Sequence, residues 1–312
     1  MAAEPTDTQG VYVTLDELTR LQFQARGFSF LPKQPIHSLL SGRHHSKLRG
    51  RGLEFEELRA YLPGDDPRTI DWKVTARMGE PYVRVYTEEK DRSALIVVDQ
   101  RIAMFFGTQV YMKSVTAAHI AAAAAWRIIG QGDRVGGVIF DDQEVVEVKP
   151  QRSKQTVLRI LHELVDKNRA LRADSPVRSN PPMLNDVLQG VARAVTHDYL
   201  VVLVSDFDGA DNETTGLVSR IARHNDVIAV PVFDPSSQGL PKAGRMVVGD
   251  GELQIEVDLG SGAQRRRLEE FTKGRLASVL AWQREIGVPV MPMSTAEPVM
   301  EQARRMLGEA AK

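Results

Sequence analysis

Acidic residues follow two apolar segments of this sequence. Asp99 ends the run ALIVVDQ (94–100), and Asp206 and Asp208 end YLVVLVSDFDG (199–209). Short continuous apolar runs are typical of strands covered on both faces, and parallel strands bring their carboxyl ends to one edge of a sheet. Carboxylates gathered there could bind a hard cation such as magnesium. They could equally cap the helices that follow the strands, so the spacing alone leaves both interpretations open.

A second candidate site is the basic stretch of residues 43–51, which contains cationic side chains, two histidines and no acid. Aromatic residues that could stack on bases follow it, as in a nucleic-acid-binding surface: Tyr61, Trp72 and Tyr82. Acids interleave with the later cations between residues 54 and 71, and each acid would repel phosphate. We therefore favour a solvated surface whose charges pair with one another, with nucleic-acid binding through 43–51 as an alternative.

The sequence lacks the short motifs of common catalytic and nucleotide-binding sites. Phosphate-binding glycine loops, the metalloprotease H-E-x-x-H and the serine-hydrolase G-x-S-x-G are all absent. Cysteine is absent too, which excludes disulfides, thiolate metal sites and cysteine nucleophiles. We expect no catalytic residues, and hence a protein that is not an enzyme.

Composition and charge narrow the class of protein further. Hydrophobic residues make up 42% and charged residues 26% of the 312 residues, which excludes wholesale disorder. The formal net charge of -1 provides no global field that would attract nucleic acid or an anionic membrane. The N-terminus is polar, and the longest apolar stretch, residues 120–126, is too short to span a bilayer. We expect a cytoplasmic protein without an integral membrane segment.

Apolar strand patterns alternate with helix patterns from residue 94 onward, after a charge-rich region at 37–93. Strands are expected at 81–89, 94–100, 199–209, 226–235 and 288–293, with hairpins at 133–150 and 246–258. Helices are expected at 14–26, 114–131, 153–167, 184–196, 213–224, 262–286 and 296–309. This alternation predicts an α/β fold with a mostly parallel sheet flanked by helices on both faces.

Residues 49–92 carry a long motif that is similar to a known family. The core is RGRGxEFxExRxYxPGDDxRxIDW at 49–72, followed by TARxGxPxVRxYxEEKDR at 75–92. With VVDQ at 97–100, FFG at 105–107 and VLVSDF at 202–207, the sequence resembles a bacterial family that is number fifty-eight in the domain-of-unknown-function series and is associated with MoxR-type AAA+ ATPases.

The resemblance implies a von Willebrand factor type A-like domain, Rossmann-like in fold, at residues 93–312. It also implies a family-specific module with the RGRG and DDxRxIDW motifs at 37–92, preceded by an N-terminal tail and helix at 1–36. Expected partners are a MoxR-type AAA+ ATPase and possibly other type A-domain proteins, with no nucleic acid. The implied function is that of an adaptor or co-chaperone for the ATPase.

Type A domains usually carry a metal-ion-dependent adhesion site, and the resemblance places its five positions on this sequence. Both carboxylate positions match, and the hydroxyl positions do not: Asp99, Arg101, Ala103, Met183 and Asp206. We expect a degenerate site with no cofactor, and if any metal binds, Asp99 and Asp206 would hold it. A magnesium-dependent ligand-binding domain is therefore an alternative function. We also predict that the guanidinium of Arg101 replaces the metal by bridging toward Asp99, Asp206 or both.

The motif residues of the module are candidates for interaction: Arg49, Arg51, Glu54, Asp65, Asp66, Arg68, Asp71, Trp72 and Arg77. We expect their first role to be structural, since Pro63-Gly64-Asp65-Asp66 is a strong turn signal. At least one of its acids, or Asp71, should pair with an arginine of the same module. Trp72 is expected to pack against the type A domain.

Overall fold

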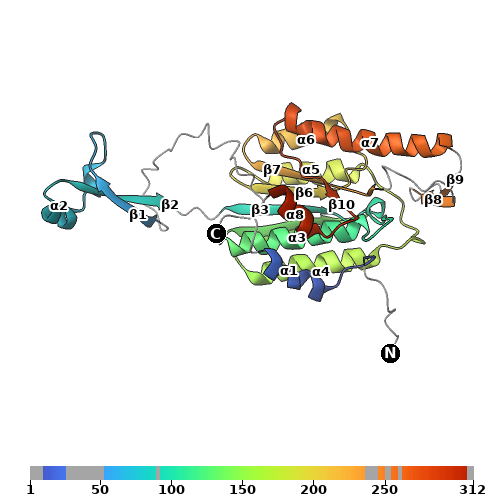
Figure 1. Cartoon of the computed structure of the whole chain (residues 1–312), viewed down its shortest axis with the longest axis horizontal. Helices are drawn as coiled ribbons and strands as arrows, with labels where there is room; N and C mark the ends of the chain where they lie inside the picture. Colours follow the sequence, from blue (N-terminus) through green and yellow to red (C-terminus); the bar gives the residue numbers. More distant parts are fainter. Residues whose placement is uncertain are drawn as a thin grey trace. The chain divides into compact units, whose positions relative to one another are not determined.

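The computed structural model describes residues 10–25, 53–88, 92–235, 245–249, 254–258 and 262–307 (Figure 1). The chain divides into two compact units, one of Met1–Lys33 with Arg92–Lys312 and one of Gln34–Asp91. The sequence predicts a separate N-terminal tail and helix at 1–36. Helix α1 (Leu15–Gln24) instead belongs to the larger unit, because its fully buried Leu18 joins the same apolar core as helix α3 (Lys113–Gly130).

A six-stranded sheet forms the centre of the larger unit, in the order β10-β7-β6-β3-β4-β5. Five strands are parallel: β3 (Ser93–Asp99), β4 (Arg134–Phe140), β6 (Leu200–Ser205), β7 (Asp226–Phe233) and β10 (Met293–Ser294). Strand β5 (Val145–Gln151) pairs antiparallel with β4 at one edge. Taken in chain order this is the 3-2-1-4-5-6 arrangement of doubly wound proteins, so the predicted α/β, Rossmann-like fold class is confirmed.

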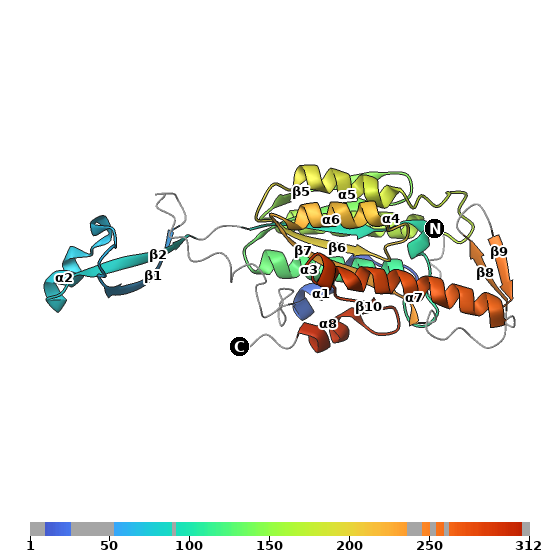
Figure 2. The same cartoon turned by 90° about the horizontal axis from the view of Figure 1, so that it is seen from above.

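Helices cover both faces of the sheet (Figure 1). The core on one face includes side chains of α1, α3, α4 (Lys154–Ala170) and α8 (Val299–Leu307). The core on the other face includes side chains of α5 (Met183–Ala194), α6 (Asn212–Ala222) and α7 (Gly262–Glu285). The hairpin of β8 (Arg245–Gly249) and β9 (Gln254–Asp258) lies beside the start of α7 (Figure 2). Most expected helices and strands are present, with ends that differ by a few residues.

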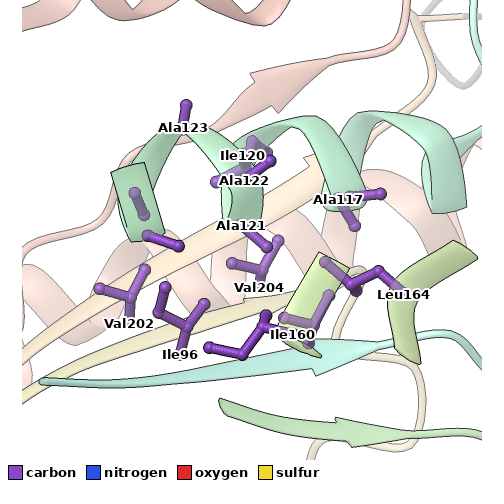
Figure 3. Packing of buried hydrophobic residues seen from close by; sticks show 14 of the residues in the cluster. Ile96, Ala117, Ile120, Ala121, Ala122, Ala123, Ile160, Leu164, Val202 and Val204 are labelled. Atoms are coloured by element: carbon purple, nitrogen blue, oxygen red, sulfur yellow. The ribbon is translucent and has the colours of Figure 1, made fainter. Parts of the chain in front are cut away.

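Helix α3 packs closely on the sheet because its contact residues are small. Its alanines at 121–125 are all fully buried, and Figure 3 shows Ala121 beside Val204 of β6. Small side chains let the helix backbone approach the branched strand residues without leaving voids. This close packing fixes the start of α3, which carries Lys113, relative to the ends of β3 and β6.

The smaller unit contains a strand and a helix that the sequence analysis missed. Strand β1 (Leu53–Ala60) pairs antiparallel with β2 (Tyr82–Glu88), and its register shifts between Phe55 and Glu57. Such a bulge breaks the apolar–polar alternation by which a strand is found. Helix α2 (Trp72–Met78) has only seven residues, too few for a clear helical period, and follows the 3-10 turn η2 (Pro67–Thr69).

Two further details differ from the predicted elements. The expected strand at 288–293 is reduced to β10, with an isolated bridge between Val290 and Ala229, and prolines 289 and 292 interrupt this segment. The expected helix at 296–309 begins at Val299, after Pro298. The hairpin tip at 250–253 lies outside the described residues.

Candidate functional site

The carboxyl ends of β3 and β6 lie side by side at the point where the strand order reverses. In open α/β sheets this switch point is where ligands usually bind. We call this region the crest and define it by the residues that meet there: 99–101, Lys113, Asp142, 180–181, 205–208 and Arg275. The two carboxylate positions of the resemblance, Asp99 and Asp206, are both in it.

Asp99 and Arg101 form a buried ion pair at the crest. The Arg101 Nε atom lies 3.1 Å from both carboxylate oxygens of Asp99, and Nη2 lies 2.8 Å from Oδ2. The backbone N–H of Arg101 also donates to Oδ1 at 2.9 Å. The side chains of Arg101 and Asp99 are 1% and 0% exposed, so water does not screen this pair.

The remaining donors of Arg101 are used as well. Nη1 donates to the carbonyl oxygens of Asn180 and Pro181, at 3.3 and 3.1 Å, and Nη2 donates to that of Asp208 at 3.0 Å. The hydroxyl of Ser205 donates to Asp99 Oδ2 at 2.6 Å. Burial by itself lowers the pKa of Arg101, but the charge and hydrogen bonds of Asp99, together with the charges of Asp206 and Asp208, outweigh it, so the net shift is upward and the guanidinium stays charged.

Asp206 has cations of its own. Its Oδ2 pairs with Lys113 Nζ, and Arg275 Nη1 lies 3.6 Å away. The N–H of Asp208 donates to Oδ1 at 3.0 Å, and the Asp208 carboxylate pairs with Arg275. Burial raises the pKa of Asp206, but the charges of Lys113, Arg275 and Arg101 lower it further, so the net shift is well below the ordinary value.

The predicted contact between Arg101 and Asp99 is therefore present, whereas Asp206 is bonded to Lys113 in place of Arg101. A guanidinium bonds both oxygens of Asp99, the atoms through which this carboxylate would bind a divalent cation. In the described part of the chain, no group of three or more histidine and acidic side chains is arranged to hold a metal. Positions 101 and 103 offer no hydroxyl.

Two positions of the predicted metal site, Met183 and Ala103, do not bring a side chain to Asp99 and Asp206. Met183 is 8% exposed and packs in the apolar core with α5, while the backbone at 180–181 reaches Arg101 instead. Ala103 lies in the 3-10 turn Ile102–Met104, whose first N–H donates to Asp142 Oδ2 at 2.6 Å.

Sequence reasoning missed three crest residues. Asp142 ties two loops together, since it accepts hydrogen bonds from the backbone N–H groups of Ile102 and Asn180. Burial raises the pKa of this carboxyl. Lys113 begins α3. A cation at a helix N-terminus interacts unfavourably with the helix dipole, so a lysine at this position indicates that it pairs with an acid elsewhere. Arg275 comes from the middle of α7, and nothing local in the sequence indicates its role.

The smaller unit pairs its motif acids internally, as predicted for Asp65 and Asp71. The Arg59 guanidinium bonds both oxygens of Asp65, at 2.8 and 2.7 Å, and Arg84 bonds Asp71 at 2.6 Å. The hydrogen bond from Arg84 holds the pKa of the Asp71 carboxyl below its ordinary value. Asp71 also caps α2 by accepting the N–H groups of Lys73 and Val74.

Other motif residues of this unit face outward. Asp66 accepts the N–H of Arg68 at the start of η2, and both side chains are at the surface, as is that of Arg77. The indole of Trp72 is 70% exposed, and its predicted packing against the larger unit stays a prediction. The remaining candidates, Arg49, Arg51 and the side chain of Glu54, lie outside the described residues, as does the basic stretch 43–51.

A profile of the family described as "Protein of unknown function DUF58" matches residues 57–278, which is more than half of the chain. The chain belongs to this family. The match runs from the motif of the smaller unit, across the crest residues at 99–101 and 205–208, to Arg275 in α7. Membership in the DUF58 family thus confirms the resemblance that the motif indicated.

Similar proteins occur in mycobacteria. An uncharacterised protein of Mycobacterium tuberculosis and one of Mycobacterium bovis are each 29% identical over 280 residues, which cover 88% of this chain and 85% of theirs. An uncharacterised protein of Mycobacterium avium is 32% identical over 99 residues, covering 31% of this chain and 57% of its own.

Solved structures with some likeness include a von Willebrand factor type A protein from Catenulispora acidiphila. It has 13% identity and a TM-score of 0.32, over 62% of this chain and 45% of its own. Proximal thread matrix protein 1 of the mussel byssus has 14% identity and a TM-score of 0.29, over 46% of this chain and 38% of its own. The fold assignment of this DUF58 protein rests on its strand order and flanking helices. No helix in the described ranges combines the length and apolar character needed to cross a membrane.

Proposed function

We propose that this DUF58 protein is a non-enzymatic interaction protein, an adaptor or co-chaperone that works with a MoxR-family AAA+ ATPase in the cytoplasm. The family resemblance suggests this partner, and the absence of a phosphate-binding loop from the sequence fits a role in which the partner hydrolyses ATP. The absence of cysteine fits a reducing compartment.

The observation that carries the proposal is the surface of the smaller unit. Two of its acids, Asp65 and Asp71, are in internal ion pairs, whereas four large apolar side chains are exposed: Leu58 by 39%, Leu62 by 58%, Trp72 by 70% and Met78 by 60%. A two-stranded hairpin with one short helix has little interior in which to bury them. Exposed apolar side chains at this density are typical of interaction surfaces, and tryptophan often dominates the binding energy of such surfaces.

The crest supports binding that needs no metal. Its carboxylates are neutralised by Arg101, Lys113 and Arg275, so the loops around them keep their arrangement without a divalent cation. The side chains of Asp99 and Asp206 are only 0% and 4% exposed, which leaves no route for a ligand's acidic group to reach them. A partner, whether the ATPase or another type A-domain protein, would contact the loops of the crest.

A pull-down with the purified ATPase tests the proposal, in the presence and absence of ATP. Trp72→Ala should weaken capture at least tenfold and leave the melting temperature unchanged, because the indole is already in water. The matched control is Phe23→Ala, which removes another aromatic ring that is 66% exposed, on α1 of the larger unit. Equal capture of wild type and Trp72→Ala would contradict an interface on the smaller unit.

The magnesium-dependent alternative has a separate test. Millimolar magnesium should leave the melting temperature of the wild type unchanged, because Arg101 holds both oxygens of Asp99. The double change Arg101→Ser and Ala103→Ser should gain a magnesium-dependent rise, since ligand binding stabilises the folded state by mass action. A rise in the wild type would favour the metal-dependent domain. Binding to DNA or RNA that weakens steeply with salt would favour the nucleic-acid alternative.

A further inference from the structure

A cleft of about 510 Å³, lined by none of the crest residues, lies between α1, the start of α3 and the start of α8. Its floor and walls include Tyr12, Glu17, Leu21, Tyr111, His119 and Met300. Helix α1 is tied to α3 by the buried Leu18, whose carbonyl accepts the indole N–H of Trp126 at 3.1 Å, and α8 packs against α3. The volume falls within the range of ordinary small-ligand pockets.

Glu17 is held in a fixed position in this cleft. Its Oε1 lies 2.8 Å from Nε2 of His119, a ring that is almost fully buried on α3. The His119 ring in turn meets the Tyr111 ring edge to face, with centroids 5.5 Å apart. The side chain of Glu17, which lines the cleft, remains 40% exposed although its Oε1 is bonded to His119.

The charge in and beside the cleft is predominantly negative. Asp16 and Glu17 line it, and Glu301 lies close enough to act on the Tyr111 hydroxyl. Arg20 is the single lysine or arginine among the described lining residues, and its guanidinium pairs with Asp16 at 2.6 Å. Burial, Glu17 and Glu301 together raise the pKa of Tyr111, which reports the same negative potential.

The walls also offer apolar and aromatic surface. Leu21, Val299 and Met300 would contact the methylene groups of a long side chain, and the rings of Tyr12 and Tyr111 would contact a planar cation. A guanidinium suits this combination better than an ammonium, because it is planar and stacks on aromatic rings.

We propose that this cleft binds an arginine side chain presented by a partner protein, with Glu17 as the group that recognises the guanidinium. Arginine binding in this cleft goes beyond the adaptor role proposed above. It uses none of the residues of the smaller unit or the crest, so either proposal can fail without the other.

The test is calorimetric titration of the whole chain at pH 8. The probe is acetyl-Gly-Gly-Arg-Gly-Gly-amide, and the control probe replaces arginine with citrulline, which has nearly the same shape without the charge. We expect the arginine peptide to bind at least about tenfold more tightly than the citrulline peptide. Equal binding of the two peptides, or no binding of either, would overturn the proposal.

Variants locate the binding to this cleft. Glu17→Gln can keep a hydrogen bond to His119 and should weaken binding of the arginine peptide about tenfold. Glu301→Gln, an exposed residue in the first turn of α8, should weaken it by less and tests the idea even where Glu17→Gln is poorly folded. The matched control is Glu147→Gln on β5, an exposed acid outside the cleft, which should bind like wild type.

Two results with these probes would contradict the assignment. Unchanged affinity in both Glu17→Gln and Glu301→Gln would place the peptide elsewhere on the protein. Free L-arginine that binds as tightly as the peptide would show that the cleft takes a small cation and needs no peptide backbone, which would overturn the assignment to a protein partner.

Discussion

The crest and the smaller unit both depend on pairs of aspartate and arginine, but the pairs differ in their access to water. At the crest, the side chains of Arg101 and Asp99 are 1% and 0% exposed. In the smaller unit, Arg59 and Asp65 are 31% and 21% exposed, and Arg84 is 48% exposed beside Asp71, whose own side chain is 7% exposed. A buried pair leaves a strongly unfavourable charge when one partner is removed, whereas a surface pair leaves a charge that water can solvate.

The surroundings of the pairs explain what each region can do. The crest lies on a sheet with two apolar cores, so its buried pairs set the positions of loops that already have support. The smaller unit has one hairpin and little apolar interior, so its ion pairs, turn and helix cap supply much of its structure. Its apolar side chains are thereby left at the surface, where a partner can bind them.

The largest expected effect is that of Arg101→Met at the crest. Removing the guanidinium leaves Asp99 buried without its cation and should lower the free energy of unfolding by about 3–5 kcal/mol. Urea denaturation of the whole chain measures this. The matched control is Arg305→Met, which breaks the exposed pair with Glu297 and should cost less than about 1 kcal/mol.

A second change checks the cause of that loss. Adding Asp99→Asn to Arg101→Met should recover part of the stability, because the buried charge is then removed as well. A loss in Arg101→Met no larger than that of the control would show that the buried pair does not distinguish the crest from the smaller unit.

An intermediate effect is expected from Asp206 as the pH falls. Its folded pKa lies below its ordinary value of 3.8, so its contribution to stability is complete above that value and is lost as the pH falls toward the folded pKa. Asp206→Asn should therefore be destabilised at pH 7, and the gap to wild type should narrow in acid.

Asp142 serves as the control for this pH dependence, because burial raises its pKa. The pH dependence of its contribution to stability is therefore the reverse. This contribution is complete below the ordinary pKa of the carboxyl and decreases as the pH rises through the folded pKa. Denaturation curves of Asp206→Asn and of the corresponding Asp142→Asn from pH 3 to 7 measure both trends. A constant gap between Asp206→Asn and wild type would contradict the role given to Lys113 and Arg275.

The smallest effect on the larger unit is expected from Asp71→Ala. The change removes the bond to Arg84 and the cap of α2, so the smaller unit should lose structure while the main melting transition of the larger unit stays in place. Limited proteolysis, with cleavage mapped to 53–88, measures the loss. The conservative Asp71→Asn, which keeps a capping oxygen, should resist cleavage better. A shift of the whole melting curve with Asp71→Ala would show that the two units unfold together.

Local signals in the sequence were sufficient for much of the fold. The buried strands were recognised from continuous apolar runs, and the motif acid Asp65 from its turn signal, whereas the role of Asp71 as the cap of α2 appears only in the structure. Strand β1 was missed because its bulge interrupts the alternation, and α2 because seven residues hold too few helical turns. In each case the error arose where the local pattern was too short or was broken.

The sequence by itself determined the fold class, the family, the carboxylates at the ends of β3 and β6, and the pairing of Arg101 with Asp99, which are two residues apart. Only the tertiary structure decided that Lys113 and Arg275 neutralise Asp206, and that Glu17, Tyr111 and His119 line one cleft. The reason is physical: these partners lie far apart in the chain, and the packing of helices on the sheet, which has no short-range signature, determines which side chains meet.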